Sequence, residues 1–211
     1  MIVDGLYEAY PNDILIHGLV ELLESHGLSV DVVKGRDAGP DVFASLTRYP
    51  LVVLRVHGGY MAGEEGVVGG LFTGVPWGTR FLDMAREGLA AEGVPVYPPP
   101  RGPRVFLALL PRFFEERLVG HFVEGSVVVA GGCYTALDPG LVEALCRRGL
   151  GAYIGFEGEV RLDVLDTLLP LIVERVLEAQ NLEDLRGLVE LHPGLRVYTC
   201  GADNNDSTQG S

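Results

Sequence analysis

Short apolar runs rich in valine, isoleucine and leucine alternate along the chain with stretches in which apolar residues recur at helical spacing. This alternation is typical of parallel strands connected by helices. The runs expected as strands are 1–7, 28–34, 51–59, 126–133, 150–158 and 194–201, with 105–111 as a further strand or hairpin arm. The stretches expected as helices are 12–27, 39–50, 80–93, 112–122, 138–149 and 161–191, the last bent at Pro170 or divided in two. The pattern predicts an α/β fold with three layers, α/β/α, around a mostly parallel sheet.

Residues 60–104 interrupt this pattern because they are rich in glycine and proline. Within them, LFTGVPWGTR (71–80) is expected to be a loop, and VPVYPPPRGPR (94–104) cannot hold regular hydrogen-bonded structure. A connection this elaborate is more often functional than idle. The last ten residues, 202–211, form a polar tail that is expected to be disordered. Residues 1–201 are therefore predicted to be a single domain.

Composition narrows the class of protein. The formal net charge of −13 argues against nucleic acid and anionic membranes as partners, because both favour basic surfaces. No apolar stretch approaches the length of a membrane-spanning helix, and the N-terminus has no signal-peptide pattern, so we expect a cytoplasmic protein. The three cysteines are widely spaced, which supports neither a disulfide framework nor a metal site. Cys146 and Cys200 are expected to be buried and unreactive, and no cofactor is expected.

Two of the apolar runs end in reactive side chains. The run LVVLRVHGG ends at His57 and two glycines, and SVVVAGGC places two glycines before Cys133. Ligands of open α/β sheets bind beyond the carboxyl ends of the strands. If these two strands are neighbours, they lie about 4.8 Å apart, and an imidazole there can take the proton of the thiol. The glycines are expected to leave room for a substrate and to free backbone amides that stabilise an oxyanion.

The order strand–His57–Gly58, then strand–Gly132–Cys133, resembles the clan CD cysteine peptidases, which include caspases, gingipain, clostripain and CHAT-domain proteins. The helix after Cys133 and the following strand, with Gly151-Ala152 and Gly155, extend the resemblance over about residues 1–177. The resemblance implies a caspase-like fold, with His57 as general base and Cys133 as nucleophile. The amides of Gly58 and of the Gly132–Cys133 segment are then the oxyanion donors.

The chain departs from these relatives at two points. The caspase pentapeptide around the nucleophile is replaced by GGCYT, so a preference for aspartate is not implied. Gly131 stands where clostripain-like relatives carry an acidic residue. The expected partner is a peptide or protein substrate, bound beside Thr73, Trp77 and Glu157. The oligomeric state is left open.

Three further interpretations come from the same residues. Cys133 with His192 faintly resembles the nucleophile and histidine of class I glutamine amidotransferases, although Thr135 replaces a glycine of their motif. The domain is alternatively an inactive member of the peptidase superfamily that binds a partner through the loop around Trp77. The exposed segment 96–104 is a candidate for self-cleavage after Arg101 by an enzyme that prefers arginine, because carboxylates surround the expected site.

Overall fold

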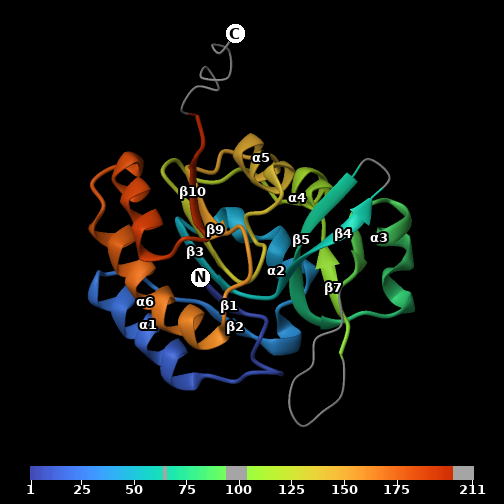
Figure 1. Cartoon of the computed structure of the whole chain (residues 1–211), viewed down its shortest axis with the longest axis horizontal. Coiled ribbons are helices and arrows are strands. Elements are labelled where there is room, and N and C mark those ends of the chain that lie inside the picture. The colour runs from blue at the N-terminus through green and yellow to red at the C-terminus, as the bar shows by residue number, and fades with distance from the viewer. Residues whose placement is uncertain (64–65, 94–103, 202–211) are drawn as a thin grey trace.

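A computed structural model describes residues 1–63, 66–93 and 104–201 of the chain (Figure 1). Its centre is a six-stranded sheet with the strand order β10-β9-β8-β3-β1-β2. Every neighbouring pair is parallel except β9 and β10, which are antiparallel. The strands of this main sheet are β1 (Ile2–Asp4), β2 (Val32–Lys34), β3 (Leu51–Arg55), β8 (Val127–Gly131), β9 (Ala152–Phe156) and β10 (Leu195–Thr199).

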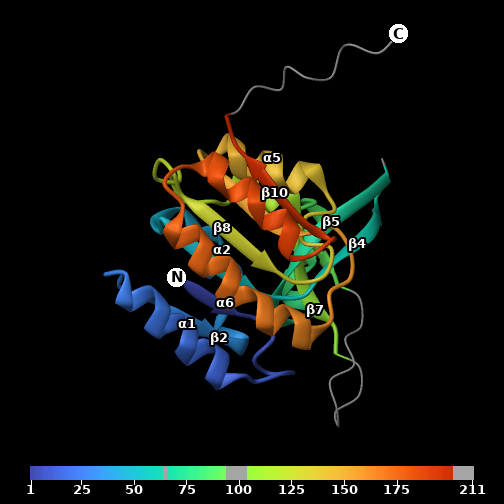
Figure 2. The same cartoon turned by 60° about the vertical axis from the view of Figure 1, so that its left-hand side comes forward.

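Helices cover both faces of the main sheet (Figures 1 and 2). One apolar core joins the sheet to α1 (Asp13–Ser25), α6 (Leu162–Glu178) and the 3₁₀ segment η4 (Leu182–Leu191). A second core joins the other face to α2 (Pro40–Ala44), α4 (Pro111–Glu116) and α5 (Pro139–Arg147). Successive residues of a strand pack into opposite cores because their side chains point to opposite faces of the sheet, as Val52 and Val53 do. The expected three-layer α/β fold is confirmed.

A second, antiparallel sheet forms between β3 and β8, where the sequence suggested irregular structure. Its strand order is β4-β5-β7-β6. The strands are β4 (Gly58–Gly63), β5 (Gly66–Pro76), β6 (Ala90–Glu92) and β7 (Phe106–Leu109). The prediction of a loop over 71–80 is therefore wrong for residues up to Pro76. Glycine and proline signal turns locally, but here ladder pairing of β5 with β4 and β7 outweighs that preference.

Strand β5 crosses the carboxyl ends of the strands of the main sheet. The backbone N–H of Gly69 donates to Asp138, which follows β8, and that of Phe72 donates to the carbonyl of His57, which follows β3. Gly74 lies against Gly35, directly after β2, so closely that a Cβ at Gly74 would collide with the carbonyl of Gly35. Figure 2 shows β4 and β5 beside the end to which the β8 arrow points.

Several helices are shorter than the apolar pattern indicates. The stretch 39–50 divides into α2 and the 3₁₀ turn η2 (Leu46–Arg48). The stretch 80–93 divides into η3 (Thr79–Phe81), α3 (Leu82–Arg86) and β6. A 3₁₀ turn, η1 (Gly35–Asp37), follows β2. Pro170 lies inside α6 without ending it, and η4 begins after Asn181, whose side chain forms a capping box with Asp184.

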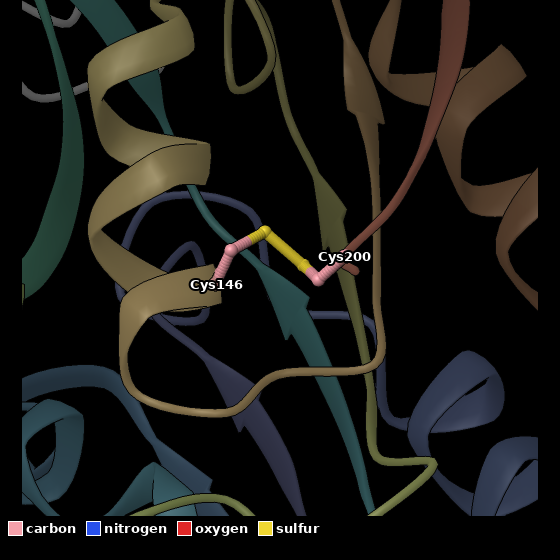
Figure 3. The surroundings of a disulfide bond; sticks show 2 residues. All are labelled: Cys146 and Cys200. Atoms are coloured by element: carbon pink, nitrogen blue, oxygen red, sulfur yellow. A yellow bond between two sulfur atoms is a disulfide. The ribbon is translucent and has the colours of Figure 1, made fainter. Parts of the chain in front are cut away.

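Cys146 and Cys200 form a disulfide, so the expectation of two unreactive thiols is wrong (Figure 3). Their 54-residue separation gives no sequence signal, but the fold brings the last turn of α5 to the end of β10, with a Cα–Cα distance of 5.3 Å. That distance is ordinary for a disulfide. Both cysteines are partly buried against the core that contains α5.

No helix in the described part of the chain has the length and apolar character needed to cross a bilayer. The cytoplasmic location stays a prediction. The segment around Arg101 and the tail 202–211 lie outside the described residues.

Candidate active site at the carboxyl edge of the sheet

His57 and Cys133 follow the ends of neighbouring parallel strands. Strand β3 pairs with β8 in a register that ends with Arg55 opposite Gly131. Each of the two candidate residues lies two positions beyond this last pair. The N–H of Val56 still donates to the carbonyl of Gly131 at 2.9 Å, so the two segments stay side by side beyond the last residue pair of the strands. The fold thus brings both residues to the same edge, which is where α/β sheets bind ligands.

The glycines beside these residues are explained by close backbone packing. A Cβ at Gly58 would overlap the carbonyl oxygen of Cys133, and one at Gly132 would overlap that of Val56. Both glycines are buried. The sequence suggested that they clear space for a substrate, but the other strand end fills that space. Their role as oxyanion donors stays a prediction.

The turn after β8 holds a strained residue next to the cysteine. Tyr134 has φ 56°, which makes it the one non-glycine residue with positive φ in the described chain. For a bulky residue this conformation costs on the order of 1–3 kcal/mol and persists only where the surroundings impose it. Such strain is concentrated at functional sites, and strand–turn–helix is a geometry that exposes a nucleophile.

Thr135 imposes this turn from within the protein. Its hydroxyl is fully buried and contacts the carbonyl oxygens of Ala130 at 2.7 Å and Gly132 at 3.1 Å, and it accepts the N–H of Phe156. Tyr153 donates its hydroxyl to the Thr135 carbonyl at 2.6 Å. Burial raises the pKa of Tyr153, which keeps this donor protonated. The turn is therefore fixed to β9.

The thiol of Cys133 lies against the segment between β9 and α6. Its Sγ is 3.4 Å from both the N and the O of Val160. Cys133 is the free cysteine of the described chain and is partly buried. In this position the thiol donates to a carbonyl, as a protonated sulfur does.

The imidazole of His57 lies among three aromatic rings. Its centroid is 6.2 Å from those of Tyr10 and Phe106 and 6.4 Å from that of Phe72. Burial, together with the charge of Arg55, lowers the pKa of His57 from 6.5 to about 4. The Nε2 atom is buried and has no hydrogen-bond partner within the described residues. The ring is therefore neutral at physiological pH, and one nitrogen is unused.

A mostly buried ionic cluster forms around Arg55, which ends β3 two residues before His57. Arg55 is 1% exposed and bonds Asp4 at 3.0 Å and Asp166 at 2.7 Å. It also donates to the carbonyl of Tyr10 at 2.9 Å, and Asn12 donates to Asp166. Burial raises the pKa of Asp4, and the Arg55 guanidinium opposes that shift. The cluster joins β1, β3, α6 and the segment after β1, and so fixes these elements to one another at the carboxyl edge of the main sheet.

The three residues expected around a substrate lie in different surroundings, and their role in substrate binding stays a prediction. Thr73 is 2% exposed inside β5, where its hydroxyl accepts the N–H of Val75, so its assignment to a loop is wrong. Trp77 is half-buried beyond the end of β5, its ring 6.2 Å from Phe81, and borders a pocket with Arg36 and Arg80. Glu157 is exposed at the edge and forms an ion pair with Arg196.

His192 also reaches this edge, because β10 runs antiparallel to β9. Its Nδ1 accepts the N–H of Gly194 at 3.0 Å, and its ring stands edge-on to Phe156 at 5.5 Å. Within the described residues His192 makes its hydrogen bond with Gly194 and its ring contact with Phe156, not with Cys133, so the amidotransferase interpretation gains no support. Nor do these residues hold a cluster of three acidic, histidine or cysteine side chains suited to a metal.

A pocket that the sequence did not predict lies beside the turn that contains Cys133. It has a volume of about 440 Å³ and is lined by Tyr60, Tyr134, Leu137, Asp138 and Pro139. The sequence could point to Tyr134 as the neighbour of Cys133 and to Asp138 as the residue that caps the following helix. It could not point to Tyr60, which reaches the pocket only through the pairing of β4 with β5.

The chain matches no model of a known protein family, and no curated protein matches it. The assignment of a function therefore rests on the site itself.

Proposed function

We propose that the protein is a cysteine peptidase in which His57 and Cys133 act as a dyad. The observation that carries the proposal is the matched position of the two residues, two places past the last pair of neighbouring strands β3 and β8. The strained Tyr134 next to Cys133 supports it independently. The resemblance to clan CD peptidases points to the same two residues.

In the proposed reaction, His57 removes the thiol proton and the sulfur attacks the carbonyl carbon of a peptide bond. The tetrahedral intermediate collapses as the C–N bond breaks, and His57 returns the proton to the leaving amine. Water then hydrolyses the thioester, which restores the thiol and releases an acid. A general base must be unprotonated to begin this cycle, and the lowered pKa of His57, about 4, leaves the ring unprotonated at neutral pH. A pKa this low also makes the imidazole a weak base, so the proposed reaction requires its pKa to rise towards neutrality when the substrate is bound.

The thiol has to leave Val160 before it reacts. A turn of the Cys133 side chain about χ1 releases both 3.4 Å contacts to Val160 and moves Sγ to another side of the strand end. Sulfur contacts of this kind are weak, so their loss is offset by contacts with a bound substrate. The expected trigger is therefore the peptide itself, and catalytic geometry often tightens only on binding.

The test is hydrolysis of a panel of fluorogenic peptides and of an unfolded protein by the wild type and by Cys133→Ala and His57→Ala. Both variants are expected to lose at least about a hundredfold in kcat/KM, as removal of a nucleophile or its base does. His26→Ala is the matched control, since this histidine is exposed at the end of α1. Wild-type activity that survives Cys133→Ala would overturn the proposal.

A second candidate is a binding domain without catalysis, as the sequence also suggested. The specific observation in its favour is that the thiol is bonded to Val160 while Nε2 of His57 is enclosed. This candidate takes precedence if the wild type cleaves no substrate yet binds peptides at the same edge.

A further inference from the structure

The pocket beside Cys133 is walled by two tyrosines from different sheets. Tyr60 comes from β4, and Tyr134 follows the end of β8; their ring centroids are 5.3 Å apart at an interplanar angle of 83°. The hydroxyl of Tyr134 bonds Glu159 at 3.3 Å, which anchors that ring. Tyr60 is 50% exposed, so one wall of the pocket is open to a ligand. A further ring or branched chain can extend this edge-to-face arrangement.

The one carboxylate in the pocket is already bonded within the protein. Asp138 accepts the N–H of Gly69 at 2.7 Å with one oxygen and that of Gly140 at 2.8 Å with the other. It also caps the N-terminus of α5, where the helix dipole favours a negative charge. The remaining walls, Leu137 and Pro139, are apolar. The pocket thus offers mostly apolar surface, and both oxygens of its one carboxylate already accept hydrogen bonds.

The pocket adjoins the reacting cysteine through the backbone. Tyr134 is the next residue after Cys133, and Tyr60 lies two residues after Gly58, whose backbone touches the Cys133 carbonyl. Tyr60 and Gly69 are opposite each other in β4 and β5, and Gly69 packs on Asp138. A peptide whose carbonyl lies at Cys133 therefore has this pocket within reach of a neighbouring side chain.

We propose that this pocket binds one large uncharged apolar side chain of the peptide, phenylalanine or leucine, and so sets the substrate class. This inference rests on the proposed peptidase function. It replaces the preference for arginine that the carboxylates around the expected site suggested, because both oxygens of Asp138 already accept hydrogen bonds. A volume of about 440 Å³ accommodates a single large side chain together with adjoining main chain.

Binding is measured on Cys133→Ala, which cannot cleave, by the anisotropy of dye-labelled capped heptapeptides that differ only in Phe, Leu, Arg or Asp at the central position. The Phe and Leu peptides are expected to bind about tenfold more tightly than the Arg and Asp peptides. Adding Tyr60→Ala to this variant should weaken the Phe peptide about tenfold, as loss of an aromatic anchor does. Tyr60→Phe retains the ring and should retain the affinity.

Ile14→Ala is the control, because this side chain is 88% exposed on α1 and apolar, but outside the pocket. Equal binding of all four peptides, stronger binding of the Arg peptide, or no effect of Tyr60→Ala with intact folding by circular dichroism would each overturn the inference. The two proposals fail separately. If the wild type cleaves peptides without preference for Phe or Leu, the pocket inference is wrong and the peptidase proposal stands. If the Phe peptide binds selectively but the wild type cleaves nothing, the peptidase proposal is wrong and the pocket inference stands.

Discussion

The backbone of Gly58 lies against the carbonyl oxygen of Cys133 so closely that any Cβ at position 58 would sit well under 3.0 Å from it. This contact joins the residue after His57 to the expected nucleophile. Both the backbone of Gly58 and the carbonyl oxygen of Cys133 belong to the main chain, so neither can move aside as a flexible side chain would. The ends of β3 and β8 can therefore come this close only because Gly58 has no side chain.

Gly58→Ala is expected to destabilise the protein by about 1–3 kcal/mol, the usual cost of forcing an extra group into packed structure. Chemical denaturation with urea measures it. Gly18→Ala is the matched control, because Gly18 lies in α1 with nothing within 4 Å of its Cβ position. That change should stabilise by up to about 1 kcal/mol through helix propensity. Equal effects of the two substitutions would show that the strand ends are not in contact.

The disulfide predicts how many thiols react. Iodoacetamide should modify Cys133 alone in the native protein, and it should modify all three cysteines only after reduction and unfolding, because Cys146 and Cys200 are bonded. In the native protein His57→Ala should slow the modification of Cys133 at least about tenfold, since the imidazole is expected to take the thiol proton. Mass spectrometry of timed samples gives the rates. An unchanged rate in His57→Ala contradicts the dyad.

Reduction of the disulfide should lower the free energy of unfolding by about 4 kcal/mol, the loop-entropy value for a closed loop of this length. The closed segment spans 54 residues. The measurement compares urea unfolding of Cys146→Ser/Cys200→Ser with that of the oxidised wild type. A loss below about 1 kcal/mol would mean that the unfolded chain gains little freedom when the bond is removed.

The partly buried His57 predicts a loss of stability in mild acid. In the unfolded chain its pKa is the ordinary 6.5, whereas in the folded protein burial lowers it to about 4. Between these values the unfolded state binds a proton that the folded state does not, so stability falls as the pH drops from about 6.5 towards 4. The shift corresponds to about 3 kcal/mol.

His57→Phe removes this proton and should flatten the pH dependence by that amount relative to the wild type. Comparison of variants is needed because carboxylates titrate in the same range. Ile14→Ala, a change at an exposed position that alters no titrating group, should leave the shape of the curve unchanged. Parallel curves for wild type and His57→Phe would contradict the burial of the imidazole.

The main sheet was predictable because its central strands are buried on both faces and read as nearly continuous apolar runs, as 51–54 and 127–131 do. The second sheet was not, because β4 and β5 are rich in glycine and their pairing depends on contacts that periodicity cannot show. Pro170 was likewise an ambiguous signal, since tertiary packing of Leu169 and Ile172 carries α6 past it.

For the site, the placement of His57 and Cys133 at strand tips was readable, whereas the directions of their side chains were not. Rings from three separate segments, Tyr10, Phe72 and Phe106, surround the imidazole, and a carbonyl from beyond β9 accepts from the thiol. The pairing of Cys146 with Cys200 was hidden for a similar reason. It depends on β10 running antiparallel to β9, which no short motif encodes.

The bond between Cys146 and Cys200 closes the chain from the end of α5 to the end of β10 into a covalent ring that includes β9, α6 and η4. A single backbone cut inside this ring, for example in η4, opens it without releasing either piece. The severed β10 stays attached to α5 through sulfur and keeps its partner β9 at a high local concentration. After such a cut β10 can therefore pair again with β9, whereas a cut before Cys146 separates two pieces that this disulfide does not join.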